Sequence, residues 1–173
     1  MMLIRNAVEI IAVMDKMAHD IEARLRYLGI KDPLMVGIHT GGVWIAQYLH
    51  QSLALTQPLG TLDISFYRDD FTRIGMHPQV KPSSLPFSIE NRHLILVDDV
   101  LHSGRTIRAA MNVLFDYGRP ARILLAVLVD RNSRELPVQA DIIGQTLELK
   151  ESQHVKLTGP DPLELYLHNN EHL

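Results

Sequence analysis

Apolar side chains recur near the helical period through the first thirty residues, which predicts a long helix. The apolar positions are Val8, Ile11, Ala18, Ile21, Leu25 and Leu28. Asn6 can cap the start of this helix and Gly29 suits its end. Two further stretches, 43–53 and 106–118, have the same period and predict two more helices.

Short apolar runs without that period predict strands. They cover residues 33–39, 61–67, 93–99, 121–130 and 140–149. In the second of these, Leu62 and Ile64 alternate with polar Asp63 and Ser65, so this strand should have one wetter face. The run 121–130 is apolar enough for the interior of a sheet.

The order of these elements predicts the fold class. Strands that alternate with helices indicate an α/β protein with an open, mostly parallel sheet flanked by helices. The stretch 68–88 carries charges, a glycine and three prolines without a clear period. Loops of that length are typically functional lids or disordered. A length of 173 residues fits a single domain over 1–173.

Composition narrows the classes of function. The chain has 17 basic and 20 acidic residues and a net charge of −3, which gives no global signature of a nucleic-acid binder. It has no cysteine, so disulfides and thiolate metal sites are excluded. The sequence shows no signal peptide and no apolar run of the roughly 18 residues that a membrane span needs. We therefore expect a cytoplasmic protein without membrane contact.

Three polar segments lie at the ends of predicted parallel strands, at 39–42, 98–106 and 129–135. Ligands of open α/β sheets bind beyond the carboxyl ends of the strands, where such loops gather. We therefore expect these three segments to form one site.

The segment 98–106 combines two kinds of chemistry. Ser103 to Thr106 form a turn directly before a helix, where free N–H groups favour an anion. Asp98 and Asp99 would repel that anion, so they should face hydroxyl groups or a hydrated cation. A sugar phosphate offers both kinds of partner. Position 99 excludes a P-loop, which needs glycine there, and residues 40–42 lack the pattern of dinucleotide folds.

The stretch VDDVLHSGRT (97–106) resembles the phosphoribosyl-pyrophosphate signature of type I phosphoribosyltransferases. Three more stretches are similar to the family of bifunctional pyrimidine operon regulators and uracil phosphoribosyltransferases: MAHDIEAR (17–24), DISFYRDD (63–70) and GRPARILLAVLVDRNSRELPVQADIIG (118–144). The resemblance covers nearly the whole chain. It implies the type I phosphoribosyltransferase fold with a flexible lid at about 68–90 and a small hood.

The resemblance also implies a reaction, in which uracil and phosphoribosyl pyrophosphate give UMP and pyrophosphate. Asp98 and Asp99 would bind the ribose hydroxyls, directly or through the Mg²⁺ that the substrate brings. The residues implied around the 5′-phosphate are Leu101, Ser103, Gly104, Arg105 and Thr106.

Other implied contacts lie on the neighbouring loops. The pyrophosphate would be bound by amides of Thr40, Gly41 and Gly42 and by the lid cation Arg68, with Arg73 as a second candidate. The implied base-reading residues are Val129, Asp130, Arg131 and Ile142.

Three positions bear on how well the implied reaction proceeds. His39 and Gly41 stand where the family usually has lysine and arginine, so weaker substrate binding or slower catalysis is expected unless Mg²⁺ and the lid compensate. His102 has two interpretations, a general base or a loop side chain that stacks over the sugar.

The family also binds messenger RNA in a nucleotide-dependent way and controls pyrimidine genes. His19 and Arg24 match the pattern for RNA contact, whereas Asp15 replaces the usual threonine. Two alternatives stay open, a nucleotide-sensing regulator with little catalysis and a phosphoribosyltransferase for a purine base. Because family members associate, we expect a homodimer or a higher homo-oligomer.

Overall fold

The computed structural model describes residues 1–65 and 83–170. Its elements are β1 (Met2–Arg5), α1 (Ala7–Leu28), β2 (Leu34–Ile38), α2 (Gly41–Ser52), β3 (Gly60–Leu62), β4 (His93–Leu101), α4 (Arg105–Tyr117), β5 (Arg122–Arg131), β6 (Ile142–Leu147), β7 (Gln153–Thr158) and β8 (Glu164–Asn169). The predicted lid cations Arg68 and Arg73 lie outside the described residues.

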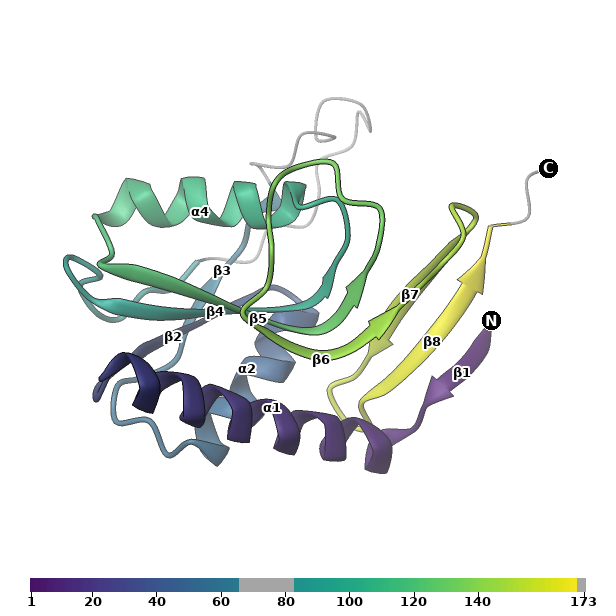
Figure 1. Ribbon diagram of the computed structural model, residues 1–173, viewed down its shortest axis with the longest axis horizontal. Helices are drawn as coiled ribbons and strands as arrows, with labels where there is room; N and C mark the ends of the chain where they lie inside the picture. Colours follow the sequence, from purple (N-terminus) through teal and green to yellow (C-terminus); the bar gives the residue numbers. More distant parts are fainter. Residues whose placement is uncertain (66–82, 171–173) are drawn as a thin grey trace.

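The main sheet has five strands in the order β3-β2-β4-β5-β6, and every neighbouring pair is parallel. Helix α4 covers one face of this sheet, while α1 and α2 cover the other (Figure 1). The predicted open parallel α/β sheet is thus confirmed. β5 is paired on both sides, as its apolar sequence predicts.

A second, antiparallel sheet stands beside the end of the main sheet, with strand order β1-β8-β7 (Figure 1). It corresponds to the small hood that the family resemblance implies. Pairing β1 with β8 brings the first and last described strands of the chain together, with Leu3 opposite Tyr166.

Helix α1 begins and ends where the sequence predicts. The Asn6 side chain accepts a hydrogen bond from the Glu9 amide at 3.0 Å, and the Glu9 carboxylate accepts one from the Asn6 amide at 2.9 Å. Gly29 ends the helix with a φ of +68°, a conformation that glycine adopts at little cost.

The predicted core face of α1 is wrong in its first turns. Val8 is 75% exposed and Ile11 is 43% exposed, whereas Ile10 and Met14 are fully buried. The stripe that faces the sheet runs through residues 10, 14, 17, 18, 21 and 25. Val8 and Ile11 lie beside this stripe, so their apolar character does not report burial.

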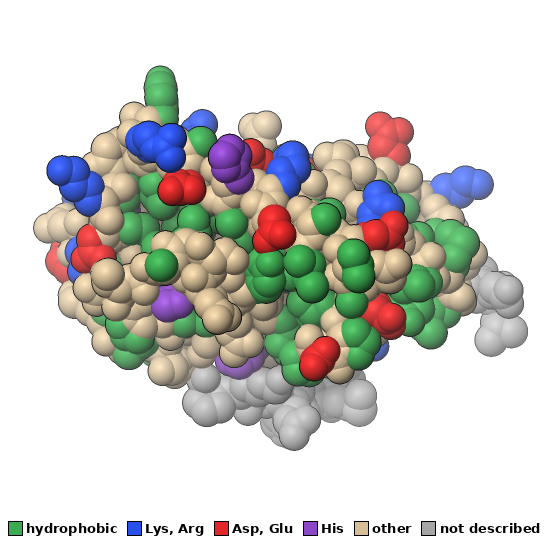
Figure 2. All heavy atoms as spheres, turned by 90° about the horizontal axis from the view of Figure 1, so that it is seen from below, with side chains coloured by type: hydrophobic (Ala, Val, Ile, Leu, Met, Phe, Trp, Pro, Cys, Tyr) green, Lys and Arg blue, Asp and Glu red, His purple; other side chains and the backbone are tan. Residues whose placement is uncertain are grey.

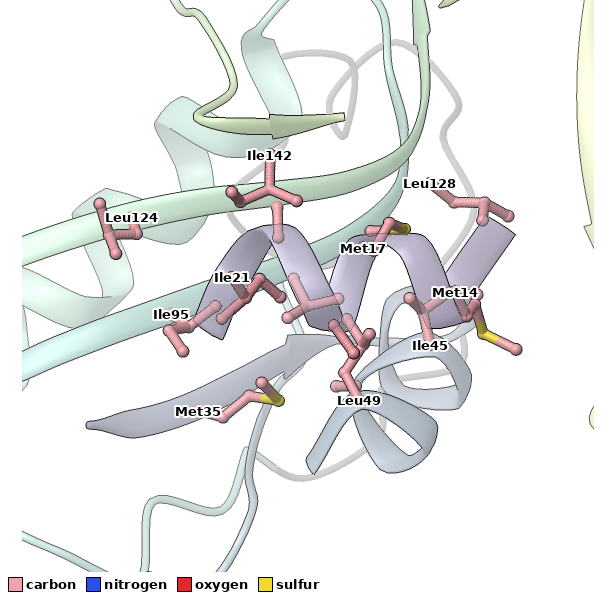
Figure 3. Close-up of a cluster of buried hydrophobic side chains, with 14 of the residues drawn as sticks. Met14, Met17, Ile21, Met35, Ile45, Leu49, Ile95, Leu124, Leu128 and Ile142 are labelled. Carbon is pink, nitrogen blue, oxygen red and sulfur yellow. The ribbon is translucent and has the colours of Figure 1, made fainter. Parts of the chain in front are cut away.

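Each face of the main sheet has its own hydrophobic core. Helices α1 and α2 pack on one face through Met14, Met17, Ile21, Ile45 and Leu49, against strand residues such as Ile95 and Leu128 (Figure 3). Helix α4 packs on the other face. Its buried residues are Ile107, Ala109, Ala110, Val113 and Leu114. The sheet is therefore held rigidly between two cores, which fixes the loops at its carboxyl edge.

The predicted strand 61–67 is shorter than expected among the described residues, since β3 covers Gly60–Leu62. Asp63, which we expected on a wet face, is only 8% exposed, and its carboxylate accepts hydrogen bonds from the amide and hydroxyl of Ser65. The described end of the predicted lid packs on this strand. Ser84 exchanges backbone hydrogen bonds with Thr61, and Ile89 is 1% exposed.

In the described ranges, every helix is too short or too polar to cross a membrane.

Candidate functional site

The acidic pair lies within β4, which runs two residues beyond Asp99. Asp98 is 5% exposed, and its Oδ1 accepts a hydrogen bond from the Asp99 amide at 2.9 Å. Asp99 Oδ1 likewise accepts from the Val100 amide at 2.8 Å. Hydrogen bonds to the ionised form stabilise a carboxylate, so two adjacent charges can be held on one strand.

The first residues of α2 lie directly against this pair. A Cβ atom at Gly42 would lie 2.6 Å from the Val97 carbonyl oxygen and 3.0 Å from Asp98 Cα. A Cβ atom at Gly41 would overlap the Asp99 carboxylate. The close approach of the backbone to β4 requires glycine at position 42, whereas a side chain at position 41 would displace the Asp99 carboxylate.

The same two glycines open α2, two residues earlier than the sequence predicts. Their amides belong to the first turn, where N–H groups have no partner within the helix. The positive end of the α2 dipole therefore faces the acidic pair and stabilises its charge. His39 and Thr40 precede this turn at the end of β2, with a cis peptide bond between them.

The turn between β4 and α4, residues 102–104, leads into the second helix N-terminus of the site. Gly104 caps α4 with a φ of +94°, in the region that favours glycine. The Ser103 hydroxyl accepts a hydrogen bond from the Arg105 amide at 3.2 Å. The turn and α4 thus combine first-turn amides, hydroxyls and the positive end of a 13-residue helix, which suits an anion.

The carboxyl end of β5 closes the site on the side opposite α2, since Leu101 pairs with Asp130. Val129 is fully buried in the core, so only its backbone can contact a ligand. Arg131 is 5% exposed, and its Nε has no hydrogen-bond partner in the described structure. A buried donor without a partner is costly, so Arg131 is suited to donate to a ligand.

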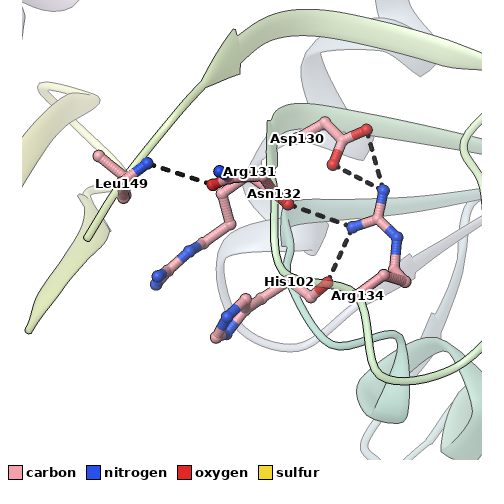
Figure 4. A network of polar contacts seen from close by, with 6 residues as sticks. All are labelled: His102, Asp130, Arg131, Asn132, Arg134 and Leu149. Atoms are coloured by element: carbon pink, nitrogen blue, oxygen red, sulfur yellow. Dashed lines mark hydrogen bonds and ion pairs between the residues drawn. The ribbon is translucent and has the colours of Figure 1, made fainter. Parts of the chain in front are cut away.

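His102 and Arg131 lie next to each other at this end (Figure 4). Burial lowers the pKa of His102 below its ordinary value of 6.5, and the positive charge of Arg131 lowers this pKa further. Glu135 opposes the shift and Arg134 adds to it. His102 is therefore neutral near pH 7 and can accept a proton.

Ile142 lies away from these groups. It is 6% exposed in the core between the sheet and α1, and it pairs with Ala126, four residues before Asp130 (Figure 3). Its side chain is therefore not included among the groups that line the site.

The sequence predicts that the polar segment 129–135 joins the site, but not that residues 134–136 contact the β4–α4 turn. The amides of Glu135 and Leu136 both donate to the Ser103 carbonyl at 2.9 Å. Arg105 Nε donates to Glu135 Oε2 at 2.6 Å. No local pattern predicts these contacts, because the partners are about thirty residues apart in a loop.

The predicted RNA-binding residues lie on α1, away from the carboxyl edge of the sheet. Arg24 forms an ion pair of 3.5 Å with Asp141. Asp15, the predicted source of repulsion, accepts a hydrogen bond of 2.5 Å from the Tyr48 hydroxyl. His19 is exposed on the same helix. Acidic and basic side chains alternate over this face of the molecule, without a continuous basic region (Figure 2).

Comparison with known sequences agrees with this geometry. The family described as phosphoribosyl transferase domain matches residues 5–160. Bifunctional protein PyrR of Pseudomonas paraeruginosa is 60% identical over 153 residues, which is 88% of this chain and 90% of that protein. Bifunctional protein PyrR of Nitrosococcus oceani is 63% identical over 134 residues, or 76% of each chain.

Solved structures share the fold at low sequence identity. The hypoxanthine phosphoribosyltransferase of Trypanosoma cruzi has a TM-score of 0.72 at 17% identity and covers 99% of this chain and 98% of that one. A Leishmania tarentolae enzyme, solved with GMP, has a TM-score of 0.66 at 19% identity and covers 85% and 81%. Fold, family match and relatives agree, and the chain belongs to the phosphoribosyltransferase family, with the bifunctional PyrR proteins among its relatives.

Proposed function

We propose that the chain is a uracil phosphoribosyltransferase that makes UMP and pyrophosphate from uracil and phosphoribosyl pyrophosphate, and that it also regulates pyrimidine genes by binding RNA in the presence of UMP. The observation that carries the catalytic role is the convergence of two helix N-termini and the acidic pair at one edge of the sheet. This arrangement offers separate places for two phosphate groups and for sugar hydroxyls. Membership of the family supports the same assignment.

The 5′-phosphate binds at the β4–α4 turn. Amides from Leu101 to Thr106 and the hydroxyls of Ser103 and Thr106 donate to its oxygens. Arg105 is held in this turn, since its Nε donates to Glu135 Oε2 at 2.6 Å and its amide donates to the Ser103 hydroxyl at 3.2 Å.

The ribose hydroxyls lie at Asp98 and Asp99, whose ionised oxygens accept hydrogen bonds from them. The same oxygens are hard ligands of the kind that Mg²⁺ prefers, and the described residues contain no cluster of three or more side chains that could hold a metal alone. The two carboxylates thus suit a magnesium ion that arrives with the substrate. When bound, Mg²⁺ would neutralise charge on the pyrophosphate.

The pyrophosphate group binds at the amides of Thr40, Gly41 and Gly42, with His39 beside them and Arg68 proposed as a further cation. In the reaction, uracil N1 forms a bond to the ribose C1 while the bond from C1 to the pyrophosphate oxygen breaks. The electron pair leaves with pyrophosphate, and the N1 proton passes to a base. His102 is suited to accept that proton because it is neutral near pH 7.

Uracil binds at the end of β5. Val129 and Asp130 contribute backbone groups, and the buried Arg131 has a free donor for a carbonyl oxygen. We further assign RNA contacts to His19 and Arg24 on α1, and we propose a homodimer or higher homo-oligomer, which analytical ultracentrifugation would test.

The catalytic proposal is tested by incubating the protein with uracil, phosphoribosyl pyrophosphate and Mg²⁺ and by measuring UMP by liquid chromatography. UMP formation that stops when EDTA removes the metal is the expected result. Thermal stabilisation by UMP without any turnover would instead indicate a nucleotide-sensing regulator.

A further inference from the structure

A short segment after β5 covers the outside of the β4–α4 turn. The Ser103 carbonyl accepts two backbone hydrogen bonds of 2.9 Å, from Glu135 and from Leu136. Val138 lies on the same side, since a Cβ atom built on Gly104 would lie 3.1 Å from its Cγ2. The turn is therefore positioned by a segment distant in sequence as well as by β4 and α4.

Arg134 connects this turn to the end of β5 (Figure 4). Its Nη1 donates to the His102 carbonyl at 2.8 Å and to the Arg131 carbonyl at 3.2 Å. Its Nη2 donates to both carboxylate oxygens of Asp130, at 2.9 and 3.1 Å. One guanidinium thus binds acceptors in the β4–α4 turn and at the end of β5, which would contact the 5′-phosphate and the base respectively.

Both side chains of the ion pair between Arg134 and Asp130 are largely shielded from solvent, which strengthens the contact. The side chains of Arg134 and Asp130 are 25% and 13% exposed, so solvent competes weakly for their hydrogen bonds. A lysine at position 134 could keep the charge, but it could not direct planar donors at all four acceptors. Loss of the guanidinium would leave the Asp130 carboxylate without its cation and would free the His102 carbonyl.

We propose that Arg134 is a positioning residue that couples the 5′-phosphate site to the base site. It holds the His102 carbonyl and the Asp130 carboxylate at a fixed separation. The phosphate site and the base site are therefore both positioned by the same side chain before the substrates bind. This inference rests on the proposed function, because it assigns the phosphate to the β4–α4 turn and the base to the end of β5.

Arg134→Gln and Arg134→Lys test the coupling in the full-length chain. Arg134→Gln should raise the KM for phosphoribosyl pyrophosphate and the KM for uracil by about tenfold each, as expected for loss of charge-assisted hydrogen bonds, while kcat changes less. Arg134→Lys should give intermediate values of both constants. Arg122→Gln is the matched control, since Arg122 begins β5, the strand that ends three residues before Arg134, is exposed and has no side-chain hydrogen bond or ion pair in the described structure.

A residue that only stabilises the fold would lower the active fraction, and so kcat, without changing either KM. That result, or a rise in one KM alone, would overturn the coupling. If Arg134→Gln does not fold, Asp130→Asn removes the same ion pair at nearly constant shape and should raise both constants in the same way.

A binding measurement separates this inference from the catalytic proposal. By calorimetry, Arg134→Gln should weaken UMP binding by a larger factor than it weakens ribose 5-phosphate or uridine, each of which occupies one half of the site. Equal factors for all three ligands would contradict the coupling even if the enzyme is active. Absence of uracil turnover in the unmodified protein would contradict the proposed function, while the calorimetric comparison would still decide the role of Arg134.

Discussion

At the scale of single residues, the surroundings of each group determine the charge that it can carry. Asp98 is almost fully buried and Asp99 lies beside the first turn of α2, yet both carboxylates accept amide hydrogen bonds. The sequence predicts that this pair is held for a ligand, and the amides of β4 and α2 explain how two adjacent charges are accommodated. His102 shows the opposite case, in which partial desolvation and the positive charge of Arg131 lower its pKa and favour the neutral form.

Replacing the acidic pair should separate activity from stability. Asp98→Asn with Asp99→Asn retains the side-chain oxygens that accept from the amides but removes both charges. Turnover should fall below detection, while the melting temperature without ligand stays nearly unchanged or rises through relief of repulsion. Calorimetric melting and the UMP assay measure the two effects.

Asp116→Asn, an exposed position on α4, is the control for the acidic pair and should change neither property. Full activity in the double variant would exclude the proposed role of Asp98 and Asp99.

The pH dependence of activity should report His102. Because its pKa lies below 6.5 in the folded protein, kcat/KM should stay constant as pH falls from 8 to 6.5 and then decrease as His102 becomes protonated. Protonation is easier in the unfolded chain, so the contribution of this group to stability is also lost as pH falls below the unfolded value.

In His102→Gln the acidic decrease of kcat/KM should disappear and the plateau should be lower. A profile with the same acidic limb in this variant would assign that limb to another group and favour stacking of His102 over the sugar.

At the scale of elements, α2 and β4 are held so close that their contact depends on residues without side chains. The first turn of α2 lies against Val97 and Asp98, and this close approach brings its amides beside the acidic pair. A helix start can be predicted from the sequence, but the distance between two elements depends on packing across the whole sheet.

Gly42→Ala should test this contact. The new methyl group would meet the Val97 carbonyl oxygen at 2.6 Å, so α2 must shift away from β4. We expect a loss of about 1–3 kcal/mol in the free energy of unfolding, typical of overpacking, together with a large loss of turnover. Ala54→Gly, outside α2, is a control for altered backbone freedom, since Ala54 has a φ of +49° that glycine adopts more easily. Wild-type stability in Gly42→Ala would show that α2 and β4 can separate without cost and would contradict this argument.

The missing loop cations can be restored only in part. A side chain at Gly41 would displace the Asp99 carboxylate, so Gly41→Arg should raise the KM for phosphoribosyl pyrophosphate rather than lower it. His39→Lys should lower that KM, because a lysine adds charge at the pyrophosphate loop. Steady-state kinetics of the two single variants distinguish the effects, and a lower KM in Gly41→Arg would contradict the steric argument.

Much of the main sheet could be predicted from the sequence because its buried strands are continuous apolar runs and its helices have clear ends. The capping box at Asn6 and the stop at Gly29 are local signals of this kind. The small sheet gives no such signal, since its pairs, such as Leu3 with Tyr166, join residues far apart in the chain. Arg134 lies in a segment predicted to join the site, but its contacts could not be predicted for the same reason: they are made to carbonyl groups that only the fold brings together.

At the scale of the whole molecule, a net charge of −3 and the intermixed charges on the face in Figure 2 argue against strong nonspecific binding of nucleic acid. Specific RNA binding would depend on a few contacts and on the ligand state of the protein. Arg24 must break its ion pair with Asp141 before it binds RNA, which lowers the net free energy gained from an Arg24–RNA contact.

Arg24→Ala should therefore weaken binding of a hairpin from a pyrimidine leader and reduce the dependence of the affinity on salt concentration. UMP should tighten binding of the same hairpin to the unmodified protein. Gel shifts at several salt concentrations measure both effects, with exposed Arg26→Ala as the control. RNA binding that ignores UMP, or that Arg24→Ala leaves unchanged, would contradict this assignment.

Turnover with a panel of bases tests the central claim most directly. The unmodified protein is incubated with Mg²⁺ and phosphoribosyl pyrophosphate, and separately with uracil, hypoxanthine, guanine or orotate, and the nucleotide products are quantified. We expect UMP from uracil, with little product from the other three bases. Preferential formation of IMP or GMP, or no product from any base, would contradict it.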